Sequence, residues 1–146
     1  MSLIARFVQY AAAFEKTYDT NDFSLLDDFF TDDIVYETSG GEPMNSLSEG
    51  RAAVYAYLEE SLDNLDRLFP TRTPGLLEGP TETDNTVWFR WTATYSKPGL
   101  PDLFIEGEER LVFERDLIRR MEDRFSADTV VRATEYLATH AEALQR

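Results

Sequence analysis

Cysteine is absent from this sequence of 146 residues, and histidine occurs only once, at His140. Without thiols there is no disulfide framework, no cysteine nucleophile and no thiolate metal site. One histidine is too few for a histidine-rich metal cluster, and it disfavours a serine–histidine–aspartate triad. The sequence also contains no glycine loop for phosphate, no dinucleotide fingerprint and no calcium loop. We therefore expect no cofactor and no bound metal.

Basic residues are scarce as well. The 14 Lys and Arg residues stand against 28 Asp and Glu residues, so the formal charge at pH 7 is −14. Phosphate backbones and anionic lipids repel such a chain, which makes nucleic acid and membrane surfaces unexpected partners. No apolar run is long enough to span a membrane, and the first residues lack the features of a secretory signal. We expect a cytoplasmic protein.

Apolar residues are plentiful despite this charge. They make up 42% of the sequence and aromatic residues alone make up 13%, which excludes a disordered acidic tail. A chain of this length buries about two-thirds of the surface that it exposes when unfolded. We expect one domain over residues 1–146, with a core of its own.

The first part of the chain has the spacing of helices. Apolar side chains recur at three- and four-residue steps over residues 3–18, which predicts one amphipathic helix. A short second helix follows Asn21 and Asp22, which offer its N-cap. The β-prone run at residues 34–38 then predicts a strand that ends in a glycine-rich turn.

The middle of the chain changes from helical to strand periodicity. Ser46 and Glu49 have the spacing of a capping box, which predicts a third helix after them, ended by Pro70. From Thr71 onward apolar and polar residues alternate with a period of two. The expected strands cover residues 71–78, with an interruption at Pro74-Gly75, residues 87–96, residues 103–114 and a segment ending near Phe125.

A final helix is expected over residues 128–144, with Val131, Leu137, Ala141 and Leu144 on its apolar side. Helices followed by consecutive antiparallel strands are typical of an α+β fold, in which helices cover one face of a curved sheet.

The hairpin of residues 106–125 is the most informative segment. A plain two-residue turn places Glu109 opposite Glu122, so that two like charges face each other and neither is paired. A bulge of one residue at Arg119-Arg120 instead gives opposite-charge pairs on the outer face and apolar pairs on the inner face. The predicted pairs are Phe113 with Ile118, Leu111 with Met121, Arg110 with Glu122, Glu109 with Asp123, and Glu108 with Arg124.

This register places two acids, Glu109 and Asp123, side by side on the apolar face. Two neighbouring carboxyls in apolar surroundings do not both ionise easily, so one pKa is expected to rise, which suits general acid–base catalysis. Alternatively, Arg90, Arg119 or a tyrosine hydroxyl satisfies one acid, or a different register leaves one in water.

Several segments resemble a known family. The first segment extends from Phe14 through Asn21-Asp22 and includes the run Phe29-Phe30-Thr31-Asp32-Asp33-Ile34-Val35-Tyr36-Glu37. The second is Gly50-Arg51-Ala52-Ala53-Val54, and the third is the hairpin from Leu111 to Phe125. They resemble ketosteroid isomerase and SnoaL-like polyketide cyclases of the nuclear transport factor 2-like superfamily. The resemblance implies a cone: a bent sheet around N-terminal helices, open at one end to an apolar pocket, and often dimeric through the outer sheet face.

The resemblance also implies roles for individual positions. The isomerase's oxyanion-hole tyrosine corresponds to Phe14, its general-base aspartate to Thr38, and its protonated second acid to Glu109. The aspartate in the last strand of the limonene epoxide hydrolase branch corresponds to Asp123. That branch also has an arginine and a second aspartate in its long middle strand. Only the arginine has a nearby counterpart in this chain, which is Arg90. The acids that remain after both comparisons are Glu109 and Asp123.

Aromatic residues are the other candidates. Tyr36, Trp91 and Tyr95 have inward parity and could line a pocket for a flat ligand, or could simply be core. Tyr18, one turn from Phe14, is a candidate for the missing hydroxyl. Tyr136 and His140 share a helix face that is either a lid or an exposed helix end.

Two functions are consistent with these features. The first is a cofactor-independent enzyme that isomerises, cyclises or dehydrates a small, apolar carbonyl compound, with Asp123 as base and Glu109 as acid. The second is a non-catalytic binding or scaffold module of the same shape. The expected partners are a small apolar ligand and a second copy of the chain, bound through the outer sheet face.

Overall fold

The computed structural model describes residues 2–145. The helical segments are α1 (Leu3–Thr20), η1 (Phe23–Leu26), α2 (Arg51–Asn64), η2 (Asp66–Leu68) and α3 (Ala127–Leu144). The strands are β1 (Phe30–Ser39), β2 (Ser46–Glu49), β3 (Thr71–Thr83), β4 (Thr86–Ser96), β5 (Leu103–Glu114) and β6 (Leu117–Phe125).

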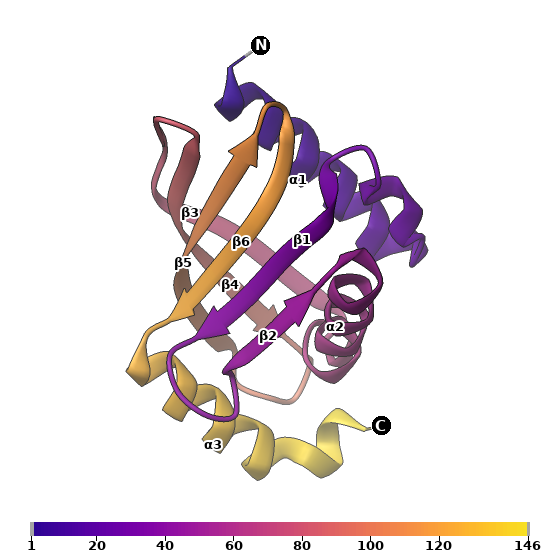
Figure 1. Ribbon diagram of the computed structural model, residues 1–146. Coiled ribbons are helices and arrows are strands. Elements are labelled where there is room, and N and C mark those ends of the chain that lie inside the picture. Colours follow the sequence, from indigo (N-terminus) through magenta and orange to yellow (C-terminus); the bar gives the residue numbers. More distant parts are fainter. Residues whose placement is uncertain (1, 146) are drawn as a thin grey trace.

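All six strands join one curved, open sheet in the order β2-β1-β6-β5-β4-β3. β1 runs parallel to β6, and the other four neighbouring pairs are antiparallel. The helices α1 and α2 lie on one side of the sheet, and α3 crosses one of its ends (Figure 1). This arrangement confirms the α+β cone, in which a bent sheet wraps around the N-terminal helices.

The core consists of two apolar clusters. The larger lies between the sheet and the helices α1 and α2, and contains fully buried side chains such as Ile34 and Leu111. The smaller contains Ile105 of β5 and Leu144 of α3. Trp91 of β4 packs against both clusters, so its ring lies where they meet.

Side-chain caps fix the ends of the helices. The hydroxyl of Ser2 accepts a hydrogen bond of 3.1 Å from the amide of Ala5 at the start of α1. Asp22 accepts one of 3.1 Å from the amide of Ser24, which confirms the predicted N-cap of the second helix. These caps satisfy backbone donors that have no partner within the helix.

The capping box predicted at Ser46 and Glu49 was wrong. Both residues belong to β2, which pairs antiparallel with β1, so that Ser46 lies opposite Thr38. The third helix begins only at Arg51, after Gly50, and has no side-chain cap. A ladder of backbone hydrogen bonds to a neighbouring strand outweighed a local capping signal.

The predicted end of the third helix at Pro70 was also wrong. α2 ends at Asn64, because Leu65 leaves the helical region with φ −137° and ψ −73°. The next residue, Asp66, accepts hydrogen bonds from side chains of α1 and β4. The helix therefore ends six residues before the proline, where Asp66 makes these tertiary contacts.

Two further expectations needed correction. β3 runs through Pro74-Gly75 without interruption, which is possible because an edge strand tolerates a missing amide donor. Val131 is 56% exposed, while Val130 and Ala133 are buried. The hydroxyl of Thr129 accepts a hydrogen bond from the amide of Glu106, which turns that face of α3 toward the sheet.

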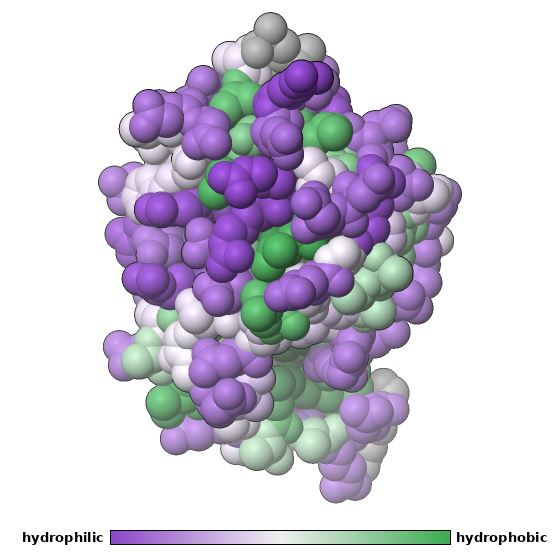
Figure 2. Space-filling view, viewed as in Figure 1, coloured by the Kyte–Doolittle hydropathy of each residue, from purple (hydrophilic) through white to green (hydrophobic). Residues whose placement is uncertain are grey.

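The surface is mostly hydrophilic on the face drawn in Figure 2, where apolar side chains gather in smaller patches. Among the described residues, no helix combines the length and the apolarity that crossing a membrane requires.

Candidate functional site

The predicted register of the β5–β6 hairpin is confirmed. Glu109 lies opposite Asp123, and the flanking pairs also match the prediction. Val112 pairs with Arg120 and Phe113 with Ile118, so the residue between the two partners is left over as a bulge. This bulge in β6 shifts the side chains of that strand, so that the Asp123 carboxyl lies on the inner face together with the Glu109 carboxyl of β5.

The pair lies in apolar surroundings, and no basic side chain of residues 2–145 forms an ion pair with it. Asp123 is 8% exposed, and its Oδ2 atom accepts a short hydrogen bond from the Tyr36 hydroxyl. Arg90 instead pairs with Glu78, at 3.7 Å on the outer face. Arg119 is exposed. Of the alternatives left open by the sequence, a tyrosine hydroxyl is therefore the group that reaches the pair.

Burial raises the pKa of both carboxyls, but unequally. The pKa of Glu109 is well above its ordinary value because of burial, the neighbouring charge of Asp123 and a hydrogen bond with that residue. Burial also raises the pKa of Asp123, but hydrogen bonds from Glu109 and Tyr36 oppose the rise. One of the two carboxyls therefore keeps its proton to a higher pH than an ordinary acid does, which places a proton donor beside a proton acceptor.

Two hydroxyls lie near the pair. Tyr10 of α1 donates a hydrogen bond of 3.4 Å to Met121 Sδ, and the charges of Glu109 and Asp123 add to the burial that raises the pKa of Tyr10. Tyr57 of α2 meets the ring of Tyr36 at a centroid distance of 5.6 Å, edge to face. Both tyrosines belong to the interior that surrounds the two acids.

Tyr10 was missed by the sequence reasoning. It lies one turn before Phe14 on α1, and the two rings are 6.3 Å apart. The signal was available, because Phe7, Tyr10 and Phe14 follow the three- and four-residue spacing of one helix face. Phe14 packs against the core and supplies no hydroxyl, and Tyr10 contributes one to the same region.

Thr38 is close to the pair in the sheet. It lies beside Asp123 across the parallel ladder of β1 and β6, and is 3% exposed. Its hydroxyl meets the Ser46 hydroxyl at 2.5 Å and the Tyr57 hydroxyl at 3.3 Å. Thr38 thus connects β2 and α2 to β1, which is the neighbour of β6, the strand that contains Asp123.

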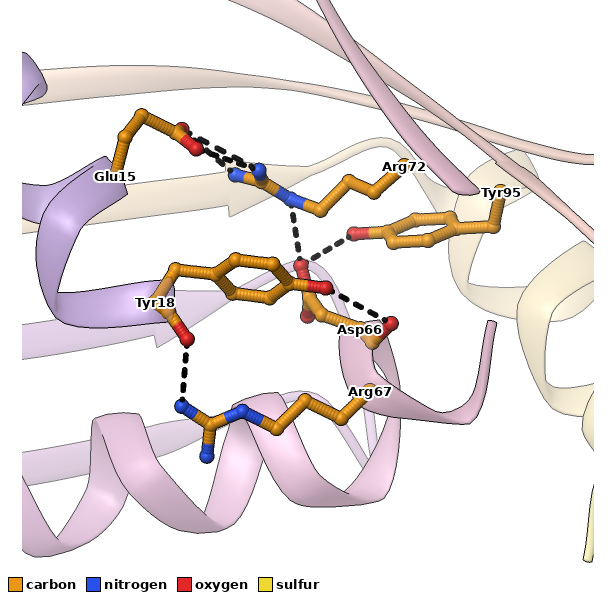
Figure 3. A network of polar contacts seen from close by, with 6 residues as sticks. All are labelled: Glu15, Tyr18, Asp66, Arg67, Arg72 and Tyr95. Carbon is orange, nitrogen blue, oxygen red and sulfur yellow. Dashed lines mark hydrogen bonds and ion pairs between the residues drawn. The ribbon is translucent and has the colours of Figure 1, made fainter. Parts of the chain in front are cut away.

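The structure places Tyr18 and Tyr95 in a different network (Figure 3). The Tyr95 hydroxyl donates a hydrogen bond of 3.0 Å to Asp66 Oδ2, and the Tyr18 hydroxyl donates one of 3.4 Å to the Asp66 carbonyl. Arg72 forms ion pairs with Asp66 at 2.9 Å and with Glu15 at 3.2 Å. Neither tyrosine hydroxyl is bound to Glu109 or Asp123.

This network was not foreseen from the sequence. Asp66 follows the end of α2 and Arg72 is the second residue of the edge strand β3, and nothing in their local spacing connects them. Burial raises the pKa of Asp66, although Arg72 and the Tyr95 hydroxyl lower it in part. The network joins α1, η2, β3 and β4 around one buried carboxyl.

Tyr136 and His140 lie together on α3, with ring centroids 4.5 Å apart. The Tyr136 hydroxyl donates a hydrogen bond of 2.6 Å to the carbonyl of Pro101, and its ring lies 6.0 Å from that of Phe69. These contacts hold α3 on the smaller apolar cluster.

Two hollows lie at the surface. One of about 490 Å³ is lined by residues that include Thr38, Ser46 and Arg124. The other, of about 410 Å³, lies on the outer sheet face and is lined by residues that include Trp88 and Arg124. Neither of these two hollows is lined by Glu109 or Asp123.

Sequence comparison places most of the chain in one family. Residues 9–121 match the SnoaL-like domain. No curated protein is similar enough in sequence to count as a relative.

Solved structures with the same fold are numerous. TerC, crystallised with polyporic acid, has a TM-score of 0.69 at 14% identity and covers 93% of this chain and 98% of its own. A proposed isomerase of the SnoaL-like family from Agrobacterium tumefaciens has a TM-score of 0.61 at 15% identity, with 84% and 98% covered. A proposed polyketide cyclase from Xanthomonas campestris has a TM-score of 0.59 at 17% identity, with 89% and 97% covered. At these identities the likeness establishes the fold alone.

Proposed function

The chain belongs to the SnoaL-like domain family, and on that premise we propose that it is a cofactor-independent acid–base catalyst acting on a small, apolar carbonyl compound. Isomerisation, cyclisation and dehydration of such compounds all need one proton removed and another supplied. Asp123 is the proposed base and Glu109 the proposed acid. Similar structures described as an isomerase and a polyketide cyclase support this reaction class.

The observation that carries the proposal is the unequal pair of carboxyls. Glu109 and Asp123 lie opposite each other in the β5–β6 ladder, and no basic group of the described residues contributes to the pKa shift of either acid. Burial raises the pKa of both acids, and hydrogen bonds oppose the rise at Asp123, whereas the charge of Asp123 adds to it at Glu109. Two neighbouring acids whose environments separate their pKa values are suited to opposite roles in proton transfer.

The proposed reaction balances without a cofactor. Asp123 accepts a proton from the substrate, and the electron pair left behind moves through the conjugated system onto the carbonyl oxygen. Glu109 donates its proton to that oxygen, where negative charge develops. Proton transfer between the two carboxyls then restores the starting state. The Tyr36 hydroxyl, bound to Asp123 Oδ2, holds the base in place.

The first test needs no substrate. Carboxyl carbons labelled with ¹³C and followed by NMR from pH 3 to 9 report the titration of each acid. We expect Glu109 to titrate above the range of ordinary glutamates and Asp123 to ionise before it. Ordinary titration of both acids below about pH 5 would remove the basis of the proposal.

The second test measures proton abstraction. Carbonyl compounds incubated in D₂O with the protein exchange their acidic protons when a base removes them, and ¹H NMR reports the rate. We expect Asp123→Asn to slow exchange by about 100-fold or more. Asp33→Asn, an exposed acid of β1, is the matched control and leaves the rate unchanged. Equal rates for Asp123→Asn and wild type would contradict the assignment of the base.

A non-catalytic binding module is the second candidate. The observation in its favour is that neither surface hollow touches Glu109 or Asp123. A module binds a small apolar ligand without exchanging its protons, so the exchange assay separates it from the enzyme. A homodimer formed through the outer sheet face and a cytoplasmic location remain predictions from the sequence, the first of which sedimentation analysis tests directly.

A further inference from the structure

A polar hollow of about 490 Å³ lies where β1 ends and β2 begins, at the end of the sheet that α3 crosses (Figure 1). Its lining residues are Glu37, Thr38, Ser39, Asn45, Ser46 and Arg124. All six side chains form hydrogen bonds, and the volume falls in the range of about 300–1,000 Å³ that is typical of small-molecule sites. The hollow therefore has room for a small polar ligand, and neither of the two catalytic candidates lines it.

The buried hydroxyl of Thr38 has its whole hydrogen-bonding capacity in use. Its oxygen lies 2.5 Å from the carbonyl oxygen of Met44, and because a carbonyl only accepts, the Thr38 hydrogen is donated there. The Ser46 hydroxyl lies 2.5 Å from the same Thr38 oxygen, and the Tyr57 hydroxyl lies 3.3 Å from it. Thr38 has no second hydrogen to give, so both of these hydroxyls donate to Thr38.

This direction of donation decides what Ser46 offers to a ligand. Its hydrogen points to Thr38, so the Ser46 oxygen presents only acceptor lone pairs to the hollow. The carboxylate of Glu37 also only accepts hydrogen bonds, and Arg120 pairs with its Oε1 atom at 3.5 Å. On this side of the hollow, the complementary ligand group is therefore a hydrogen-bond donor, and a positively charged one fits best.

Arg124 supplies the opposite charge. It lies beside Ser39 across the β1–β6 ladder, and its side chain is 73% exposed. Its guanidinium lies 3.8 Å from Glu108, and so exposed an ion pair is weak enough to yield to a ligand. The acid and the base of the hollow, Glu37 and Arg124, thus pair with residues outside its lining, Arg120 and Glu108.

We propose that this hollow binds a small zwitterion of the amino acid type. The ammonium group of the ligand donates hydrogen bonds to the Ser46 oxygen and the Glu37 carboxylate, and its own carboxylate accepts from Arg124. A ligand with two separated charges and no net charge matches a lining with one acid and one base. Glu37 and the formal charge of −14 repel a simple anion, and a simple amine leaves Arg124 without a counterpart. This site does not depend on the proposed catalysis.

Glycine is the probe for this site, because it carries both charges and no side chain. In ¹⁵N-labelled protein, we expect millimolar glycine to shift the backbone amide resonances of Ser39, Asn45 and Ser46 and to leave those of β3 in place. Betaine is glycine with three methyl groups on its nitrogen, so it keeps both charges and has no N–H. It should bind about 5-fold or more weakly than glycine. Methylamine and acetate, which carry one charge each, should also bind about 5-fold or more weakly.

Two substitutions locate the ammonium group. Ser46→Ala should weaken glycine binding about 5-fold and leave betaine binding unchanged, because only glycine donates a hydrogen bond to the Ser46 oxygen. Glu37→Gln should weaken both ligands about 3-fold, since it removes a partly exposed charge that attracts both. The matched controls are Ser48→Ala and Glu49→Gln, whose positions belong to β2 but do not line the hollow. Both control variants should bind glycine as the wild type does.

Three outcomes overturn the inference. They are unmoved amide resonances of the hollow in millimolar glycine, equal affinity of the wild type for glycine and betaine, and equal glycine affinity in wild type and Ser46→Ala. Should Ser46→Ala fail to fold, the comparison of glycine with betaine on the wild-type protein decides alone. Glycine bound in the hollow of a protein whose Glu109 and Asp123 titrate normally leaves the inference standing and contradicts the proposed function.

Discussion

Two buried carboxyl sites in this molecule resemble each other in all but one respect. At the first, Asp66 accepts a hydrogen bond from the Tyr95 hydroxyl, and at the second, Asp123 accepts one from the Tyr36 hydroxyl. Burial raises the pKa of both aspartates. The difference is the third partner, which is the guanidinium of Arg72 at Asp66 and the carboxyl of Glu109 at Asp123.

That third partner decides what each site can do. Arg72 compensates the charge of Asp66, so the pair stays ionised and ties η2 to β3. Within residues 2–145 the acid pair has no such basic partner, and the raised pKa of Glu109 favours a proton donor next to an acceptor. A buried acid with a basic partner is suited to structure, and a buried acid with an acidic partner is suited to proton transfer.

The substitution with the largest expected effect on stability disrupts the first site. Asp66→Asn leaves the Arg72 guanidinium, whose side chain is 14% exposed, with the Glu15 carboxylate and the face of the Tyr18 ring as partners. We expect the free energy of unfolding at pH 7 to fall by about 3 kcal/mol, near the low end for breaking a buried ion pair because Glu15 remains. Urea unfolding measures the change.

Asp63→Asn is the control for this loss. Asp63 pairs with Arg67 at 2.7 Å within one helical turn, and its side chain is 54% exposed. Its replacement should cost no more than about 0.5 kcal/mol. A similar cost for both variants would show that Asp66 is no more structural than a surface acid.

The next effect has the opposite sign and concerns the second site. Glu109→Gln keeps the shape of the side chain and removes its titration. Because the folded protein holds the Glu109 proton to a higher pH than the unfolded chain does, wild-type stability falls as pH rises from the ordinary glutamate pKa to the raised one. The variant lacks this fall and should be more stable than wild type at pH 8, by about 1 kcal/mol or more.

Thermal unfolding of both proteins at pH 5 and pH 8 measures this difference, which should grow with pH. Glu108→Gln is the control on the same strand. Glu108 faces outward and pairs with Arg124 at 3.8 Å, so its variant should follow the wild-type pH dependence. A Glu109→Gln protein that is less stable than wild type at pH 8 would mean that Glu109 is ionised and satisfied.

The substitution with the smallest expected effect tests the role of Tyr36 at the second site. Tyr36→Phe removes the hydrogen bond that lowers the pKa of Asp123, so that pKa should rise. Carboxyl NMR measures the shift, and the stability cost should stay near 1 kcal/mol. Tyr57→Phe removes a hydroxyl that contacts Thr38 at 3.3 Å and should leave the Asp123 titration in place. An unchanged Asp123 pKa in Tyr36→Phe would contradict this role.

Much of the second site was predictable, because a hairpin register depends on residues close in sequence. The charges and apolar residues of the segment 106–125 select one pairing, and the bulge follows from their parity. The first site was not predictable in this way. Asp66 and Arg72 come together only because α2 ends early and β3 takes the edge of the sheet.

Local signals failed where a distant segment competed for the same backbone or side chains. Ser46 joined β2 because β1 offered a ladder, and Tyr95 turned to Asp66 rather than to the acid pair. Tyr10, by contrast, was overlooked although its position on the α1 stripe was visible in the sequence.

The sequence by itself determined the fold class and the pairing of Glu109 with Asp123, because hydrophobic periodicity and hairpin register are properties of neighbouring residues. Only the tertiary structure decided that the pKa values of the two acids rise and that Tyr36 opposes the rise at Asp123, since burial and the reach of Tyr36 depend on the packing of β1 against β6. It also decided that the indole of Trp91 faces Asp123, because that orientation requires Gly107 beneath the ring.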